Sequence, residues 1–336
     1  INVVCYYCFH HSCFDLQITA TTNYLAVNYQ TVTETMAEYE EMIATELMLN
    51  KIEKWKRIGG GCSSNNWAFK TDIGEIFTKI SRDENGKDLL LGELKSLEAL
   101  QTAKAVRVPR PIKVVSSNNT MILVTEYIQF SGLRVFQGEL GHQLAILHQR
   151  NLELLKNNSD QAVKQFGFYV NVCCGILPVD NQWNKNWIDF YCNQRLKPQI
   201  ENAACKSGNK EVERLWSLLE PKVNQLFDGV TVLPSLLHGD LWSGNVGETK
   251  DEPVIYDPAS FYGHHEFDLA ITRMFGGFSK EFYQRYHQLI PREKGFEGRK
   301  PLYELFHYLN HWNHFGGGYE EQSLGILRNL VKFLDC

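Results

Sequence analysis

The stretch Leu236–Asn245, which reads LLHGDLWSGN, constrains the fold of this chain more than any other part of the sequence. Asn245 follows Asp240 after four intervening residues, and Asp257 comes seventeen residues after Asp240, at the end of the run PVIYD. Protein kinases carry this Asp-x4-Asn spacing, with HRD in place of HGD, and a metal-binding Asp further on. Phosphoryl transfer requires a carboxylate that accepts the hydroxyl proton and oxygen ligands that hold magnesium. We therefore expect Asp240 to be the catalytic base, and Asn245 and Asp257 to bind Mg²⁺.

The alternative for this stretch is purely structural, with Asp240 capping a helix and Asn245 lying in a turn. A lone Asp-x4-Asn spacing arises by chance. The apolar run before Asp257 predicts a short strand that delivers this carboxylate near the other two residues, which favours the functional reading.

A glycine-rich run, GGGCSS, begins at Gly59 between two strand-like segments. Glycines let main-chain N–H groups approach phosphate oxygens closely. The run lacks the GK[ST] ending of a Walker A loop, which argues against a P-loop NTPase. In the strand-like run IFTKI, Lys79 shares a face with Phe77 and is placed like the strand lysine that contacts nucleotide phosphates in kinases, although a surface lysine is the alternative. The residues expected at the phosphates are Gly60, Gly61, Cys62, Ser63 and Lys79. A thiol among such N–H groups favours the thiolate, so we also hypothesise that Cys62 makes activity redox-sensitive.

The run LLLGELKSLEALQ predicts a helix in which Glu93, Leu97 and Leu100 share one face. A carboxylate on an inward face requires a cation, so we expect Glu93 to pair with Lys79. The alternative acid for this role is Glu98.

The apolar run MILVTEYI, residues 121–128, predicts a strand that ends at a hinge between two lobes. We expect main-chain groups of Glu126, Tyr127 and Ile128 to bind the adenine of ATP. An ordinary exit from a strand into a loop is the alternative. Further upstream, the run MAEYEEMIATELMLNKIEKW predicts a helix that begins at Met36.

With these residues in place, the sequence resembles the fructosamine-3-kinase and ketosamine-3-kinase family, relatives of the aminoglycoside phosphotransferases that share the protein-kinase-like fold. The resemblance extends from about Trp55 to the C-terminus. It is carried by the runs GGGCSSNNWAFKTDIGEIFTKI, FGFYVNVCCG, LLHGDLWSGNV, YDPASFYGHHEFDLAI, MFGGF and LFHYLNHWNHFGGGY.

The resemblance implies an α+β, bilobal fold, with a small antiparallel-sheet lobe over residues 36–128 and a mainly helical lobe over residues 129–336. Residues 1–35 lie outside it and are expected to be a disordered or artefactual extension. It also implies ATP and Mg²⁺ as cofactors, and ketoamines as substrates, either small molecules or sugar adducts on protein lysines. Phosphate would go to the sugar O-3, which leads to breakdown of the adduct. The alternatives are a kinase for an aminoglycoside or amino alcohol, and a nucleotide-binding scaffold without turnover.

We also expect roles for three further residues in the segments that resemble the family. Trp242, two residues beyond Asp240, is expected to stack on the sugar, as the tryptophan at this motif position would in the family; packing behind the loop is the alternative. Asp268 is expected to brace the catalytic loop. His311 lies at helical spacing with His307 and His314, and we expect it to line the substrate pocket; metal binding and core hydrogen bonding are alternatives.

The bulk composition narrows the partners and the compartment. The net charge is -5 and no basic stripe is present, which argues against nucleic acid and anionic membranes. No apolar run reaches the length of a membrane span. An odd number of cysteines, nine, favours a reducing, cytoplasmic setting over a disulfide-bonded one, with an organelle as the alternative. A monomer or a homodimer is expected.

Overall fold

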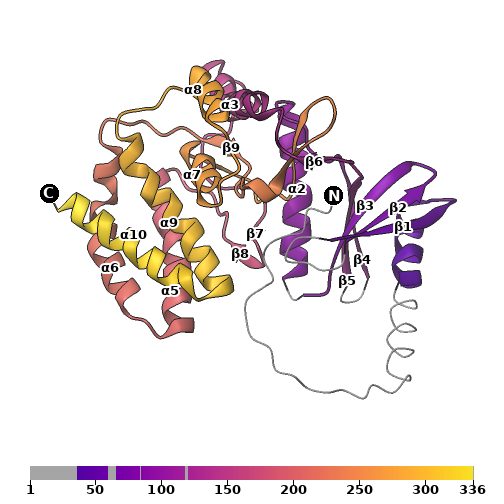
Figure 1. Cartoon of the computed structure of the whole chain (residues 1–336), viewed down its shortest axis with the longest axis horizontal. Coiled ribbons are helices and arrows are strands. Elements are labelled where there is room, and N and C mark those ends of the chain that lie inside the picture. Colours follow the sequence, from indigo (N-terminus) through magenta and orange to yellow (C-terminus); the bar gives the residue numbers. More distant parts are fainter. Residues whose placement is uncertain (1–35, 60–65, 84, 118–119, 336) are drawn as a thin grey trace. The chain divides into compact units, whose positions relative to one another are not determined.

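The computed structural model describes residues 36–59, 66–83, 85–117 and 120–335. Contacts divide the described chain into two compact units (Figure 1). Unit 1 runs up to Gly86 and includes Pro111–Tyr127, and unit 2 comprises Lys87–Arg110 and the chain from Ile128 onward. The chain leaves unit 1 at Tyr127, where the sequence places the hinge. The segment Lys87–Arg110, which we expected in the small lobe of residues 36–128, groups instead with unit 2.

Unit 1 is built on an antiparallel sheet with the strand order β1-β2-β3-β5-β4. Its strands are β1 (Ile52–Ile58), β2 (Asn66–Thr71), β3 (Gly74–Ser81), β4 (Pro111–Ser117) and β5 (Thr120–Glu126). Strands β2 and β3 form a tight hairpin in which Thr71 pairs with Gly74. Gly74 has a φ of 109°, a conformation that L side chains rarely adopt, so glycine permits this turn.

A helix over residues 36–47 covers one face of this sheet. Met36, Tyr39 and Ile43 recur at helical spacing and are buried with Ile76 and Ile80 of β3. The predicted helix therefore forms, but it ends earlier than the sequence suggested. The segment that follows, IEKWKRI, pairs with β2 as strand β1, because a partner strand can satisfy its main-chain groups there.

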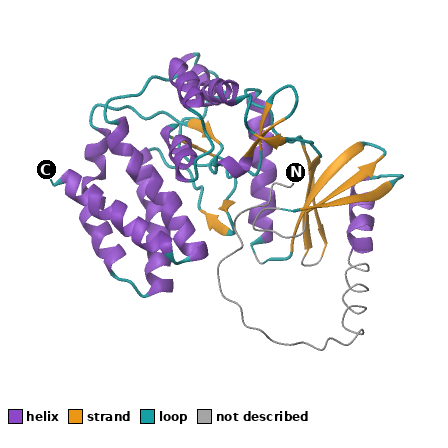
Figure 2. Ribbon diagram, in the orientation of Figure 1, coloured by secondary structure: helices purple, strands orange, loops and turns teal. Residues whose placement is uncertain are grey.

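Unit 2 is mainly helical, in contrast to the strand-rich unit 1 (Figure 2). Its α-helices are α2 (Gly86–Ala103), α3 (Gln137–Lys156), α4 (Trp187–Tyr191), α5 (Lys197–Ser207), α6 (Glu211–Leu219), α7 (Glu266–Met274), α8 (Lys280–Leu289), α9 (Phe296–Phe315) and α10 (Gly318–Leu334). Together with the antiparallel sheet of unit 1, these helices confirm the α+β fold class. None of the helices in the described part of the chain is both long and apolar enough to cross a membrane.

Short strands in unit 2 carry the segments of chemical interest. They are β6 (Ser131–Gly132), β7 (Val172–Cys174), β8 (Leu177–Val179), β9 (Ser235–Leu237), β10 (Val246–Glu248), β11 (Pro253–Ile255) and β12 (Phe261–Gly263). Strand β9 enters the HGD turn and pairs with β12, while β10 and β11 form the hairpin that leads from Asn245 to Asp257. The predicted strand before Asp257 is thus present.

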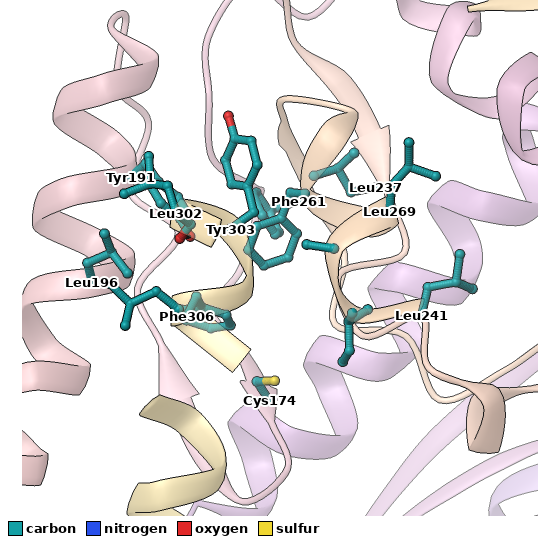
Figure 3. Close-up of a cluster of buried hydrophobic side chains, with 14 of the residues drawn as sticks. Cys174, Tyr191, Leu196, Leu237, Leu241, Phe261, Leu269, Leu302, Tyr303 and Phe306 are labelled. Atoms are coloured by element: carbon teal, nitrogen blue, oxygen red, sulfur yellow. Dashed lines mark hydrogen bonds between the residues drawn. The ribbon is translucent and has the colours of Figure 1, made fainter. Parts of the chain in front are cut away.

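The core of unit 2 lies directly against the HGD turn. Leu237 and Leu241, on either side of this turn, are fully buried. They belong to one hydrophobic cluster with Phe261, Tyr303 and other residues (Figure 3). Burial of both flanking leucines fixes the turn to the core at two points, because each buried leucine stabilises the fold by roughly 1.5–3 kcal/mol.

Candidate active site

The HGD turn brings the chain closer to a neighbouring loop than any residue other than glycine would allow. Gly239 has a φ of 86°, and a Cβ atom placed there would lie 2.0 Å from the main-chain oxygen of Ala259. A side chain at this position would therefore have to push the two loops apart. Glycine stands where protein kinases carry the arginine of HRD because there is no space for more.

Asp268 on α7 braces this turn from inside the core. Its carboxylate accepts the main-chain N–H of His238 at 2.7 Å and that of Gly239 at 2.8 Å. It also lies 3.1 Å from Nε2 of His148, whose Nδ1 contacts the hydroxyl of Tyr286. Burial alone would raise the pKa of Asp268, but His148 and the main-chain N–H groups together hold that pKa below its usual range. The predicted bracing role of Asp268 is confirmed.

Asp240 and Asn245 face each other across the loop. Nδ2 of Asn245 donates to Oδ2 of Asp240 at 3.1 Å and to the main-chain oxygen of Asp240 at 2.9 Å. The same Nδ2 lies 3.5 Å from the main-chain oxygen of Asp257. If Oδ1 of Asn245 took the place of Nδ2, it would be repelled by the negative charge of the Asp240 carboxylate. The side-chain amide is therefore oriented with Nδ2 toward Asp240 and Oδ1 away from it. Asp240 remains partly exposed, as a base that meets a substrate must be.

The loop that carries Asp257 is fastened to the HGD turn by His238. Nδ1 of His238 accepts the main-chain N–H of Asp240 at 3.2 Å, and its Nε2 lies 3.0 Å from the carbonyl oxygen of Tyr256. This pattern corresponds to a neutral imidazole with its proton on Nε2, and burial lowers the pKa of His238 accordingly. One buried ring therefore sets the distance between the two loops.

Asp257 itself has a φ of 55°, a left-handed conformation that is uncommon for residues other than glycine. Main-chain bonds on either side hold it there: Tyr256 donates to Asn245 at 3.0 Å and Ala259 donates to His238 at 2.9 Å. Local strain that the surroundings enforce is common where a side chain must be aimed at a ligand.

The oxygen atoms of Asn245 and Asp257 suit a magnesium ion. Carboxylate and amide oxygens are hard ligands of the type that Mg²⁺ takes, and magnesium sites of kinases use one or two such side chains together with phosphate oxygens. Because Nδ2 of Asn245 is engaged by Asp240, its Oδ1 is the ligand atom that this residue can offer.

Trp242 lies in the same loop as Asp240, and its main-chain N–H donates to the Asp240 carbonyl oxygen at 3.1 Å. Its ring is partly buried and meets Phe275 edge to face, with 5.6 Å between ring centroids. A Cβ on Gly244 would lie 2.0 Å from the indole, so the loop wraps closely around this ring. His311 of α9 also contacts Phe275, at 5.0 Å between ring centroids. The two predicted substrate residues are thus joined through one phenylalanine that the sequence reasoning had not singled out.

A buried glutamine fixes the segment that carries Phe275. At the start of α3, Gln137 donates from Nε2 to the main-chain oxygen of Gly277 at 2.9 Å and accepts from the N–H of Ser279 at 3.0 Å. Gly277 in turn packs against Ser243, since an added Cβ would lie 2.5 Å from the Ser243 side chain. Nothing in the sequence around Gln137 signalled this role.

The three histidines of α9 do not form a metal site. Nδ1 of His311 contacts the main-chain oxygen of His307, and Nδ1 of His314 contacts that of Asn310, both at 2.7 Å. Among the described residues, the only cluster of three or more His, Cys, Asp or Glu side chains within reach of one ion is His264, His265 and Glu266. Both oxygens of Glu266 are engaged by Arg299, so that group is a structural ion pair.

The residues expected at the nucleotide are placed as follows. Lys79 of β3 and Glu93 of α2 are each only 7% exposed, and Glu93 shares its buried face with Leu97 and Leu100. The alternative acid, Glu98, binds Lys95 at 2.7 Å near the surface. Gly60, Gly61, Cys62 and Ser63 lie outside the described residues, and with them the proposed redox role of Cys62.

The hinge residues differ in which main-chain hydrogen-bonding groups are already engaged. The N–H of Tyr127 donates to the carbonyl oxygen of Glu75 at 3.0 Å, which continues the β3–β5 ladder. Glu126 ends β5, opposite Ile76. The Tyr127 N–H is thus engaged within unit 1, so adenine contacts would fall on other main-chain groups of Glu126, Tyr127 and Ile128.

Comparison of the sequence with known proteins shows the family to which this chain is similar. The family model described as fructosamine kinase matches residues 33–333. A ketosamine-3-kinase of Mus musculus is 45% identical over 308 residues, 87% of this chain and 100% of that protein. A chloroplastic protein-ribulosamine 3-kinase of Arabidopsis thaliana is 37% identical over 296 residues, 88% of this chain and 87% of that protein.

Solved structures agree on the fold. A protein of Haemophilus somnus provisionally described as a fructosamine-3-kinase superposes with a TM-score of 0.72 at 22% identity, over 87% of this chain and 96% of that one. The aminoglycoside phosphotransferase APH(4)-Ia superposes with a TM-score of 0.54 at 13% identity, over 90% of this chain and 98% of that one. Both the resemblance and the kinase-like fold expected from the sequence are confirmed.

Proposed function

Because this chain belongs to the fructosamine kinase family, we propose that it transfers phosphate from ATP to O-3 of ketosamines, including fructosamine, ribulosamine and psicosamine adducts. Both relatives described above carry ketosamine or ribulosamine kinase names. The observation that supports the activity most directly is the convergence of Asp240, Asn245 and the Asp257 loop on one another.

In the proposed reaction, Asp240 orients the O-3 hydroxyl and accepts its proton as the phosphoryl group is transferred. Asn245 keeps the carboxylate in place through Nδ2. Asn245 Oδ1 and the Asp257 carboxylate would hold Mg²⁺, which when bound neutralises phosphate charge. Trp242 would stack on the apolar side of the sugar, and His311 would line the same site.

The nucleotide would be bound by the other expected residues. Lys79 would contact its phosphates together with the glycine run Gly60–Ser63, and the hinge would hold its adenine. The structure of a protein with a related fold, a variant of APH(4)-Ia, was solved as a ternary complex with ADP and hygromycin B. Burial of Lys79 supports a specific role, since lysines are almost never buried without a partner.

Phosphorylation at this position would undo the sugar adduct. Loss of a proton from C-1 of a ketosamine, with protonation of the C-2 oxygen, gives an enaminol with a C-1=C-2 double bond. The nitrogen lone pair can then expel the phosphate from C-3 as inorganic phosphate, and water hydrolyses the resulting imine to release the amine. The adduct then breaks down without further enzyme. Glycated protein lysines are the proposed physiological substrates, acted on in a reducing intracellular compartment by a monomer or homodimer.

A substrate panel tests this proposal. ATP consumption is measured with fructosamine, ribulosamine and psicosamine derivatives, and in parallel with aminoglycosides and amino alcohols. We expect turnover with the ketosamines and loss of it in the Asp240→Asn variant. Turnover with an aminoglycoside alone would replace the proposed substrate class, and no turnover with any acceptor would support a nucleotide-binding scaffold.

A further inference from the structure

A surface cavity lies next to the proposed sugar site, in unit 2. It has a volume of about 250 Å³ and opens where the end of α7, the middle of α9 and the start of α10 meet. Its lining residues are Met274, Phe275, Tyr308, Gly318, Tyr319 and Gln322. Whole small-molecule ligands generally occupy roughly 300–1,000 Å³, so a cavity of this size suits a fragment of a ligand.

The cavity shares walls with the sugar site. Phe275 lines the cavity and also contacts both Trp242 and His311. Tyr319 lines it from the opposite helix and contacts His311 at 5.2 Å between ring centroids. The cavity is therefore separated from Trp242 by a single aromatic ring, that of Phe275.

The lining combines aromatic and methionine side chains with polar groups that carry no charge. Three of the six residues are aromatic and one is methionine, and the polar groups are phenol hydroxyls and one carboxamide. Burial raises the pKa of Tyr308, and the acid Glu304 and Tyr319 act in the same direction, so this phenol stays neutral. The aromatic and methionine side chains offer methylene groups a surface to pack against, and no lining side chain would pair with a charged end.

A ketosamine has a second half that the sugar site does not account for. Its nitrogen is attached to C-1, beside the C-2 carbonyl and close to the O-3 that Asp240 would activate. The substituent on nitrogen must therefore leave the sugar site within a few bonds. In a glycated protein, that substituent is the aliphatic stem of a lysine side chain.

We propose that this cavity is an amine-side subsite that binds the aliphatic stem of the ketosamine, the lysine methylenes in a glycated protein. The proposal rests on the proposed function, because it assigns a place to part of the same substrate. It makes Phe275, Tyr308 and Tyr319 determinants of which amines are accepted.

The subsite predicts that affinity increases with the length of the stem. The test compares fructosyl adducts of methylamine, ethylamine, propylamine and butylamine, which share one sugar. Each methylene that binding removes from water improves affinity by about fourfold. In the wild-type protein we therefore expect KM to fall stepwise along the series, with kcat and the KM for ATP unchanged.

Gly318 offers a variant that fills the cavity without strain. It lines the cavity, its φ lies outside the left-handed region, and a Cβ there would meet nothing within 4 Å. Gly318→Leu should remove most of the increase in affinity that a longer stem provides. KM for the butylamine adduct should therefore rise by about tenfold or more. KM for the methylamine adduct should stay within about twofold of wild type.

Gly325 provides the matched control. It lies in the same helix, α10, away from the cavity lining, and a Cβ there also meets nothing within 4 Å. Gly325→Leu should keep the wild-type dependence on stem length. A flat wild-type series, or an unchanged series in Gly318→Leu, would overturn the subsite while the methylamine adduct still reports activity. Absence of phosphorylation for every adduct would overturn the proposed function, and the subsite with it.

Discussion

Asn245 holds the carboxylate of Asp240 by a hydrogen bond of 3.1 Å from Nδ2 to Oδ2. The bond couples two roles, because the residue proposed to bind the metal also restrains the residue proposed to accept the proton. Positioning of this kind can supply a large part of catalysis, since a small misplacement of a reacting group costs much of the rate.

We expect Asp240→Asn to abolish most phosphate transfer while ATP still binds. An amide at this position cannot accept the hydroxyl proton, and loss of general-base help typically lowers the rate about 10²- to 10⁴-fold. The measurement is kcat with a ketosamine, alongside the Kd for ATP. The control is Asp251→Asn, at the exposed turn between β10 and β11, which should keep full activity. Near-normal turnover in Asp240→Asn would remove Asp240 from the catalytic role.

We expect Asp257→Ala to lose magnesium-dependent ATP binding, because the triphosphate would lack its counter-ion. Asp257 has a φ of 55°, so alanine there adds backbone strain of about 1–2 kcal/mol. Asp257→Asn separates the two effects, since asparagine tolerates this conformation but lacks the charge. Titration of ATP with and without Mg²⁺ is the measurement. Unchanged magnesium dependence in both variants would contradict the assignment.

Trp242→Ala tests whether Trp242 contacts the substrate or only packs in the core. If the indole holds the sugar, its loss should weaken ketosamine binding by roughly 1–3 kcal/mol, which is a rise in KM of about 5- to 150-fold. KM for ATP and the melting temperature should then change little, because the ring is only partly buried. A large fall in Tm with unchanged ketosamine KM would place Trp242 among the core residues instead.

His307 predicts a pH dependence of stability. Burial lowers the pKa of His307 to about 3, with a smaller contribution from His311, against about 6.5 in an unfolded chain. Between these values the unfolded chain binds a proton that the folded chain does not, so stability falls as the pH drops below about 6.5. For this one residue the loss between pH 7 and pH 5 is about 2 kcal/mol.

His307→Phe should remove that contribution, because phenylalanine does not titrate. The ring would enter an aromatic environment that already includes Phe267, at 4.8 Å between centroids. Urea unfolding at pH 7 and pH 5 gives the difference in free energy for each protein. An equal difference in wild type and variant would show that His307 does not control the acid sensitivity.

Contacts between residues close in sequence could be predicted, and contacts between distant ones could not. Asp240, Asn245 and Asp257 lie within one short segment, so their spacing limits how they can be arranged. The link from Gln137 to Gly277 spans 140 positions and involves a side-chain amide with no periodic pattern around it. The same holds for Phe275, which joins Trp242 and His311 only because three separate segments meet there.

Ambiguous local signals account for the remaining differences. The polar and apolar residues after Met48 fit a helix and a strand almost equally, and the presence of β2 as a partner decided in favour of β1. Two residues of one type can also differ: Trp183 and Trp187 are close in sequence, yet Trp187 is buried in the core while Trp183 is exposed. Composition alone does not separate such a pair.

The close approach of Gly239 to Ala259 has a consequence for regulation. In many protein kinases, phosphorylation switches activity on when an arginine captures the new phosphate and orders the activation loop. The HGD turn has no room for such an arginine, since even a Cβ would lie 2.0 Å from the Ala259 oxygen. The turn is instead held by the two main-chain hydrogen bonds to Asp268. We therefore expect the conformation of this loop not to depend on a phosphate bound through residue 239.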